Sequence, residues 1–303
     1  MFAKMTRFQA DGLLLFTAAI WGLAFVAQKS GMHGLGPLGF IGIRSAFSAL
    51  VVLPLFIMER RAEADKPKMR HVDWLLMCGT AVAFFGGVWC QQAGMATASV
   101  TNAGFLTALY VVCTPIIGLL LFRHRQSVII WPACLLAIVG VYLLNGASLS
   151  RFTPGDWLIM LCAVFFGVQI NLMGMLMRRI QRPVTICLMQ SAFCAIMGLG
   201  IGGMTEGISW SGVTDNLGPL LYAGVISGGI GFTLQAFAQQ HTPSADAAII
   251  MSAEALFAAF GGAVLLNERL GVISWVGCAL IFTAILTVEL YPLLAKKAQT
   301  GAA

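Results

Sequence analysis

Ten long apolar runs, separated by short polar or charged segments, constrain this sequence more than any other feature. A helix that crosses a bilayer needs about 20 mostly apolar residues, and each run approaches that length. The runs are continuous rather than alternating, which excludes the strands of a membrane β-barrel. They cover residues 11–30, 37–58, 74–94, 100–122, 128–145, 156–177, 183–204, 217–239, 246–266 and 271–291. The sequence therefore predicts an all-α integral membrane protein with ten transmembrane helices.

The composition excludes the soluble classes of protein. Of the 303 residues, 59% are apolar and 10% are charged, and the mean hydropathy is +0.87. Because a soluble domain carries roughly a quarter charged residues, a single soluble globule, a disordered chain and the soluble enzymes are all excluded. The charges that are present cluster between the runs, which leaves almost no room for an extramembrane domain.

Lys and Arg residues are distributed unevenly between the two sides of the predicted membrane. If the amino terminus is cytoplasmic, only Lys29, Arg151 and Arg269 lie on the opposite side, and Arg44 lies within a run. The cytoplasmic side receives Lys4, Arg7, Arg60, Arg61, Lys66, Lys68, Arg70, Arg123, Arg125, Arg178, Arg179, Arg182, Lys296 and Lys297. Because Lys and Arg are enriched in cytoplasmic loops, this bias predicts that both termini are cytoplasmic. The net charge of +6 then reports topology, and we expect no nucleic-acid partner.

The chain contains an internal repeat. A shift of 144 residues places Trp131-x-x-Cys134 on Trp275-x-x-Cys278 and Tyr110 on Glu254. A shift of 146 places Ser45-Ala46-Phe47 on Ser191-Ala192-Phe193, and the order of matches is kept along the whole chain. The protein is therefore a duplicated five-helix unit. Because five is odd, the second copy enters the membrane from the opposite side, as in secondary transporters whose substrate site lies between the halves near the midplane.

The repeat also predicts the domain boundaries. We expect a cytoplasmic amino terminus over residues 1–10, a first repeat over 11–145, a linker over 146–155, a second repeat over 156–291 and a cytoplasmic carboxyl terminus over 292–303.

Three segments resemble the EamA-type permeases of the drug/metabolite transporter superfamily. Thr17-Ala-Ala-Ile-Trp-Gly-Leu-Ala-Phe25 is similar to the family's first-helix signature, and Ala103-Gly-Phe-Leu-Thr-Ala-Leu-Tyr-Val-Val-Cys-Thr-Pro115 to its fourth-helix signature. Glu254 to Leu270, ending in Asn267-Glu-Arg-Leu270, resembles the ninth-helix counterpart. The chain departs from the family at His124-Arg125, where Glu-Arg is frequent, and at Ala255, where Pro is frequent. The resemblance implies a multi-pass carrier of small metabolites in a bacterial inner membrane, frequently an exporter of amino acids or related compounds.

Glu254 is the only acidic residue placed well inside a run, about eight residues from its start and thus roughly 12 Å deep. An ionisable side chain at that depth is a functional candidate by default. Glu254 either carries a proton or binds a substrate amine, or it forms a neutral hydrogen bond between helices. Its repeat mate Tyr110 enters from the other face to the same depth, so both are expected to line one central cavity.

Other polar side chains inside the runs are candidates for substrate binding. Arg44 either pairs with a substrate carboxylate or extends to the outer interface, whereas Lys29 is read as an interfacial anchor. Trp21, Phe25 and Gln28 share one helix face, which suits either a binding wall or ordinary packing. Gln169 is favoured among the amides because Phe165 precedes it by four residues. The others, which serve equally well as bonds between helices, are Gln91, Gln92, Asn171 and Gln235.

The glycines and cysteines have structural interpretations. Gly86-Gly87 and Gly228-Gly229-x-Gly231 permit close approach of helices, either as static packing or as a surface along which the halves rock. The eight cysteines lie inside apolar runs without Cys-x-x-Cys pairs or His partners. We therefore expect no metal site and no cofactor.

Three functional classes compete. A secondary transporter, exporting or importing a small organic solute and coupled to protons or passive, fits the duplication. A membrane-embedded enzyme would require a catalytic cluster at membrane depth, but the four histidines lie at run ends or in loops. A channel would require a charged ring or filter sequence, and neither is visible. No Gly-x-x-x-x-Gly-Lys-Ser/Thr loop for ATP is present.

The expected partners are a small-molecule substrate, the lipid bilayer and protons as coupling ion, without an obligate protein partner.

Overall fold

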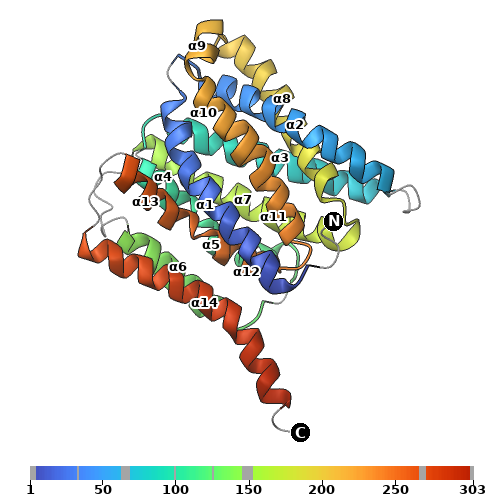
Figure 1. Ribbon diagram of the computed structural model, residues 1–303, viewed down its shortest axis with the longest axis vertical. Helices are drawn as coiled ribbons and strands as arrows, with labels where there is room; N and C mark the ends of the chain where they lie inside the picture. Colours follow the sequence, from blue (N-terminus) through green and yellow to red (C-terminus); the bar gives the residue numbers. More distant parts are fainter. Residues whose placement is uncertain are drawn as a thin grey trace.

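The protein is all-helical in the parts of the chain that the computed structural model describes, which are residues 5–32, 34–62, 69–98, 100–124, 126–144, 153–265 and 271–300. The helices are arranged as Figure 1 shows. Their bounds are α1 (Arg7–Ser30), α2 (Pro37–Ala62), α3 (His71–Gly94), α4 (Val100–Thr107), α5 (Tyr110–Leu120), α6 (Ile130–Leu144), α7 (Pro154–Arg179), α8 (Pro183–Thr205), α9 (Trp210–Asp215), α10 (Leu217–Leu221), a π-helical segment η1 (Tyr222–Gly231), α11 (Phe232–Ala238), α12 (Ser244–Met251), α13 (Glu254–Leu265) and α14 (Val272–Thr300).

Every predicted apolar run corresponds to a helix or to helices in series. Within the described residues, eight helical stretches are long and apolar enough to cross a membrane, and two shorter apolar helices cover Ile130–Leu143 and Val272–Val288. The protein is therefore a multi-pass membrane protein, as predicted. Three runs that we expected to form single helices are segmented: α4 precedes α5, α10 precedes η1 and α11, and α12 precedes α13.

The helix contacts are those of two interleaved five-helix repeats. Helix α2 packs on α8 and α6 packs on α14, so each of these pairs joins equivalent helices of the two repeats. In Figure 1 these two pairs lie along opposite edges of the molecule. Helix α1 packs on α12 and α13, and its repeat mate α7 packs in the same way on α4 and α5. The exact repeat boundaries remain predictions, and most of the expected linker 146–155 lies outside the described residues.

Two glutamates join α2 to α8, one at each end of the helix pair and by the same kind of contact. The carboxylate of Glu206, just after α8, accepts hydrogen bonds from the backbone amides of Leu38 and Gly39 at the start of α2. The carboxylate of Glu59, near the end of α2, accepts bonds from the amides of Val184 and Thr185 at the start of α8. Each carboxylate satisfies otherwise unpaired amides and complements the positive end of a helix dipole.

The glycines singled out in the sequence lie at contacts between the repeats. A side chain at Gly86 or Gly87 would meet the rings of Phe165 and Phe166 on α7. On η1, Gly228 faces Ser48 of α2, Gly229 faces Val51 of α2 and Gly231 faces the indole nitrogen of Trp21 on α1. Close approach of helices is therefore observed, and sliding along these contacts stays a prediction.

A methyl group added at Gly198 should destabilise the fold. A Cβ there would lie 2.6 Å from the Gly42 Cα and 2.9 Å from the Leu38 carbonyl oxygen, both of which are backbone atoms that cannot rotate away. We expect Gly198→Ala to lower the free energy of unfolding in detergent by about 1–3 kcal/mol, the usual cost of overpacking.

The matched control for this prediction is Gly200→Ala on the same helix, where a Cβ meets nothing within 4 Å. Because Ala has the better helix propensity, that change should be neutral or stabilising by up to about 1 kcal/mol. Equal effects of the two substitutions in an SDS titration would show that the α2–α8 contact tolerates expansion.

Candidate functional site

A cavity lies between the two repeats, enclosed by side chains from both. Its empty space, opening included, measures about 500 Å³. The lining comprises Trp21, Phe25, Gln28, Arg44, Val88, Gln91, Thr107, Tyr110, Phe166, Gln169, Ile170, Ser227, Phe232, Gln235 and Glu254.

All seven candidate substrate-binding residues from the sequence line this cavity: Trp21, Phe25, Gln28, Arg44, Tyr110, Gln169 and Glu254. The helical spacing of the first three on α1 accounts for their common face. The indole nitrogen of Trp21 donates to the Ser227 carbonyl oxygen at 3.2 Å, and its ring lies 4.5 Å from that of Phe232. The structure thus brings the predicted residues together, and their binding of substrate remains a prediction.

The cavity is built from repeat-equivalent pairs, which is how sequence analysis could have found the lining residues that it missed. The same shifts that align the repeats relate Trp21 to Phe166, Phe25 to Ile170, Val88 to Phe232, Gln91 to Gln235 and Tyr110 to Glu254, and both members of every pair line the cavity. The approximate two-fold axis therefore passes through the cavity. Where the two members of a pair differ in chemistry, as Tyr110 and Glu254 do, the two halves of the site offer different groups to a solute.

Tyr110 and Glu254 each occupy the first position after a helix break. Helix α4 ends at Thr107 and α5 begins at Tyr110, and the equivalent helix α12 ends at Met251 before α13 begins at Glu254. Tighter i→i+3 hydrogen bonds cross both breaks, among them Leu109 N–H to the Leu106 oxygen and Ala253 N–H to the Ile250 oxygen. Discontinuous helices near the midplane are typical of substrate sites in inverted-repeat transporters.

The cavity contains two buried side chains of opposite charge that do not pair with each other in the described residues. Arg44 is 6% exposed, its guanidinium carbon lies 6.0 Å from the centre of the Phe40 ring, and its Nε has no hydrogen-bond partner. The interpretation that Arg44 extends to the outer interface is therefore wrong, because α2 packs this face against η1 and α8. Glu254 is 3% exposed, and its Oε1 also lacks a partner.

Tyr110 and Glu254 interact electrostatically across the cavity. The hydroxyl of Tyr110 and the carboxylate of Glu254 lie close enough to form a hydrogen bond, although neither that hydroxyl nor Oε1 of Glu254 has a partner of good geometry. Both interpretations of Glu254, as a proton or amine site and as a hydrogen-bonded contact between helices, therefore stay predictions. A solute amine or hydroxyl placed between the two groups would satisfy both of them.

The amide side chains divide into available and structural ones. Gln28, Gln169 and Gln235 each keep one buried amide atom without a partner, whereas Gln91 donates to the Thr107 hydroxyl at 3.2 Å. Asn171, in contrast, donates to two backbone carbonyl oxygens outside the cavity lining, so it is a bond between helices.

One sequence interpretation needs correction, and another gains a contact. The aromatic companion of Gln169 in the cavity is Phe166 rather than Phe165, because Phe165 packs on Gly86 of α3. That Lys29 is an interfacial anchor stays a prediction, and its ammonium group donates to the carbonyl oxygens of Met95 and Ala98 just after α3. Lys29 therefore satisfies carbonyls at the end of a neighbouring helix.

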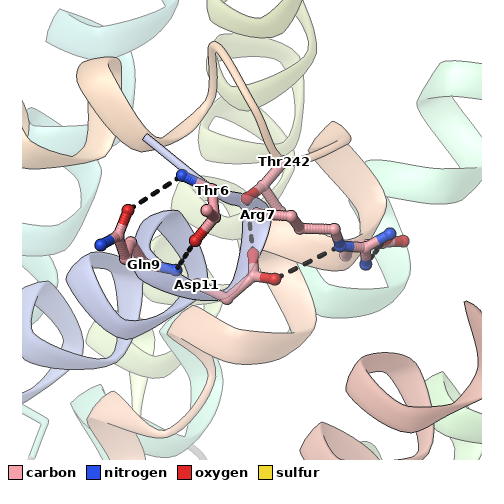
Figure 2. A network of polar contacts seen from close by, with 6 residues as sticks. Thr6, Arg7, Gln9, Asp11 and Thr242 are labelled. Carbon is pink, nitrogen blue, oxygen red and sulfur yellow. Dashed lines mark hydrogen bonds and ion pairs between the residues drawn. The ribbon is translucent and has the colours of Figure 1, made fainter. Parts of the chain in front are cut away.

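Beyond the cavity, a polar network joins the start of α1 to the start of α12. The side chain of Asp11 accepts hydrogen bonds from Arg7 and from the hydroxyl of Thr242, as Figure 2 shows. Arg7 also pairs with Asp246. At the equivalent place in the other pair, α7 and α4, Asp156 accepts a bond from Asn102 at 3.3 Å. These carboxylates lie at helix ends, where the sequence placed them.

Comparison with known proteins agrees with this architecture. A model of the EamA-like transporter family matches residues 9–146 and 153–290. An uncharacterized transporter of Archaeoglobus fulgidus is 30% identical over 94% of this chain and 87% of its own length. The uncharacterized transporter YwfM of Bacillus subtilis is 26% identical over 95% and 96%. A solved crystal structure has the same fold, with a TM-score of 0.74 and 15% identity over 93% of this chain and 96% of that chain. The chain therefore belongs to the EamA-like transporter family, within the drug/metabolite transporter superfamily.

Proposed function

We propose that the protein carries small, amino-acid-like organic solutes across the membrane by alternating access around the central cavity. The observation that carries this proposal is the pair of opposite, unpaired charges, Arg44 and Glu254, within one buried cavity. A zwitterion would neutralise both groups, since a guanidinium suits a carboxylate and a carboxylate suits an amine. The aromatic rings of Trp21, Phe25 and Phe166 offer an apolar wall for the remainder of the solute.

The direction of transport and the driving force are part of the proposal. Export follows from the resemblance to family members that export amino acids; an importer or facilitator of the same fold is the alternative. Glu254 is the proposed proton carrier, because a buried carboxylate that lines the cavity beside the Tyr110 hydroxyl can bind and release a proton there.

The test is transport by the purified protein in proteoliposomes. Radiolabelled L-threonine, L-leucine and L-phenylalanine, which represent polar, aliphatic and aromatic side chains, are supplied with and without an imposed pH gradient. Accumulation of at least one of them above protein-free vesicles supports the function, and its dependence on the gradient supports proton coupling. Failure of all three to exchange, even in counterflow, would contradict the proposal.

Truncating the aromatic wall should weaken binding. Trp21→Ala and Tyr110→Ala each remove ring area that borders the cavity, so we expect the half-saturation constant for the transported amino acid to rise by about tenfold. The effect is measured in counterflow, with size-exclusion profiles in detergent as the check on folding. Trp157→Ala is the control, because Trp157 lies on the exposed surface of α7 and is absent from the cavity lining. Unchanged affinity in both cavity variants would place the site elsewhere.

The proposed topology has both termini in the cytoplasm of a bacterial cell, with the protein in the inner membrane. Cysteine tags placed between residues 59 and 73 and at the carboxyl terminus should then react with a membrane-impermeant reagent only after the cells are opened. A tag placed at residue 207, just after α8, should react in intact cells. Reaction of either of the first two tags in intact cells would contradict the cytoplasmic placement, and reaction of only one of them would contradict the ten-helix inverted arrangement.

A further inference from the structure

The repeat relates Arg44 to a residue that the cavity does not include. The shift of 146 that aligns Ser45-Ala46-Phe47 with Ser191-Ala192-Phe193 places Arg44 on Gln190, immediately before three identical residues. Arg44 is the eighth residue of α2 and Gln190 is the eighth of α8, and both helices begin with Pro. Their equivalence therefore holds in the structure as well as in the sequence.

Gln190 is buried, and its polar atoms have no partner. Its side chain is 1% exposed, and neither its amide nitrogen nor its amide oxygen makes a hydrogen bond in the described structure. It is the only described glutamine whose two amide atoms are both buried without a partner. A buried amide without partners is unfavourable. Such a group is explained if another state of the protein, or its ligand, satisfies it.

Arg44 and Gln190 lie at different depths along the α2–α8 pair. The two helices are antiparallel, and the hydroxyls of Ser48 and Ser191 are hydrogen-bonded at 2.9 Å, which fixes their register. Arg44 precedes Ser48 by four residues on α2, and Gln190 precedes Ser191 by one residue on α8. Because the helices are antiparallel, these two offsets point in opposite directions and add. At 1.5 Å per residue, the two side chains originate about 7–8 Å apart along the axis. Arg44 lies toward the face at which α2 begins, and Gln190 toward the face at which α8 begins.

The two repeats are thus not equivalent in this structure, because Arg44 lines the cavity and Gln190 does not. In an inverted-repeat carrier, alternating access moves one repeat against the other around a fixed site. If the repeats exchange conformations, Gln190 takes the place that Arg44 now has, and Arg44 withdraws.

We propose that Gln190 is the counterpart of Arg44 in the opposite access state, so that an anionic group of the solute is held by Arg44 in one state and by the Gln190 amide in the other. This assignment rests on the proposed transport function. A guanidinium binds a carboxylate through charge-assisted bonds that are about twice as strong as those of a neutral amide. The solute is therefore bound more tightly in the access state in which Arg44 lines the cavity than in the state in which Gln190 does.

The test compares the half-saturation constant at the two faces, in right-side-out and inside-out vesicles, with labelled L-threonine, L-leucine and L-phenylalanine as the probes. We expect the wild-type constants at the two faces to differ by about tenfold. Arg44→Gln should remove most of that difference. The exchange variant Arg44→Gln/Gln190→Arg, which has the same composition as the wild type, should reverse it.

Gln190→Ala keeps the test decisive should an arginine at position 190 prevent folding of the exchange variant. It should raise only the higher of the two half-saturation constants, by about threefold to tenfold. Ser48→Ala is the matched control, because it alters the same helix pair between the two residues and should leave the ratio of the constants unchanged.

The outcomes separate this assignment from the proposed function. If the wild type transports none of the probes, the function itself is contradicted, and the assignment with it. Suppose that the wild type transports a probe, but Gln190→Ala leaves the ratio of the two constants unchanged, or the lower constant stays at the same face in a folded exchange variant. Gln190 then has no role in binding, and the proposed transport function stands.

Discussion

Glu254→Gln is expected to abolish accumulation of substrate driven by a pH gradient while leaving counterflow without a gradient largely intact. Glutamine keeps the size and hydrogen-bonding capacity of the side chain but cannot ionise, so a proton can no longer be carried at this position. The side chain is 3% exposed and begins α13 directly after a helix break, where it lines the cavity. The measurement is uptake of labelled amino acid into proteoliposomes with an imposed pH gradient, beside counterflow at equal pH.

Two results would reassign Glu254. Loss of counterflow together with accumulation would make it a substrate ligand or a requirement of the fold, and an unchanged pH dependence would exclude the proton role. Asp215→Asn is the control, because it removes a carboxylate that is exposed at the end of α9, away from the cavity. That variant should match the wild type in both assays.

The architecture was predictable because two strong patterns determine it. The ten apolar runs are set by the thickness of the bilayer, and each of them corresponds to helical structure in the described residues. The repeat was visible because identical residues such as Trp131 and Trp275 recur in order. The stripe of Trp21, Phe25 and Gln28 was predictable for the same reason, since helical spacing alone places the three on one face.

The helix breaks were not predictable, because they depend on contacts between distant segments. Neither Ala108-Leu109 nor Ser252-Ala253 contains the Gly or Pro that usually marks an interruption. The second break lies against α1, where a Cβ at Gly22 would be 2.6 Å from the Glu254 carbonyl oxygen. The break before Glu254 therefore coincides with close packing against α1, and the residues at the break do not themselves predict it.

The environment of Arg44 was undetermined for a similar reason. Depth along a helix limits how far a long side chain must reach to the interface, but it does not say which face of the helix is covered. That face is covered by η1, whose Gly224 approaches the Arg44 carbonyl oxygen so closely that a Cβ there would lie 2.5 Å away. The π-helical geometry of this segment was equally invisible in the sequence.

Arg7 is the one cation that the network at the start of α1 contains within the described part of the chain. Arg7 binds Asp11 at 3.3 Å and also Asp246 of α12, and these carboxylate side chains are only 2% and 14% exposed. The two carboxylates lie near enough to repel each other. Removing one partner of a buried ion pair leaves an uncompensated charge, and here it would leave two like charges together.

Arg7→Ala should therefore reduce the free energy of unfolding by about 3 kcal/mol, the lower end of the range for a broken buried pair, because about one third of the Arg7 side chain is exposed. An SDS titration of the purified protein measures the loss. Gln9→Ala, which removes an exposed helix-capping contact two residues away, should cost less than about 1 kcal/mol. In the double variant Arg7→Ala/Asp246→Asn the like-charge repulsion is gone, so at least half of the lost stability should return. If Arg7→Ala instead costs no more than Gln9→Ala, the ion pairs of Arg7 contribute little, and the α1–α12 contact is held by the Thr242 hydroxyl on Asp11.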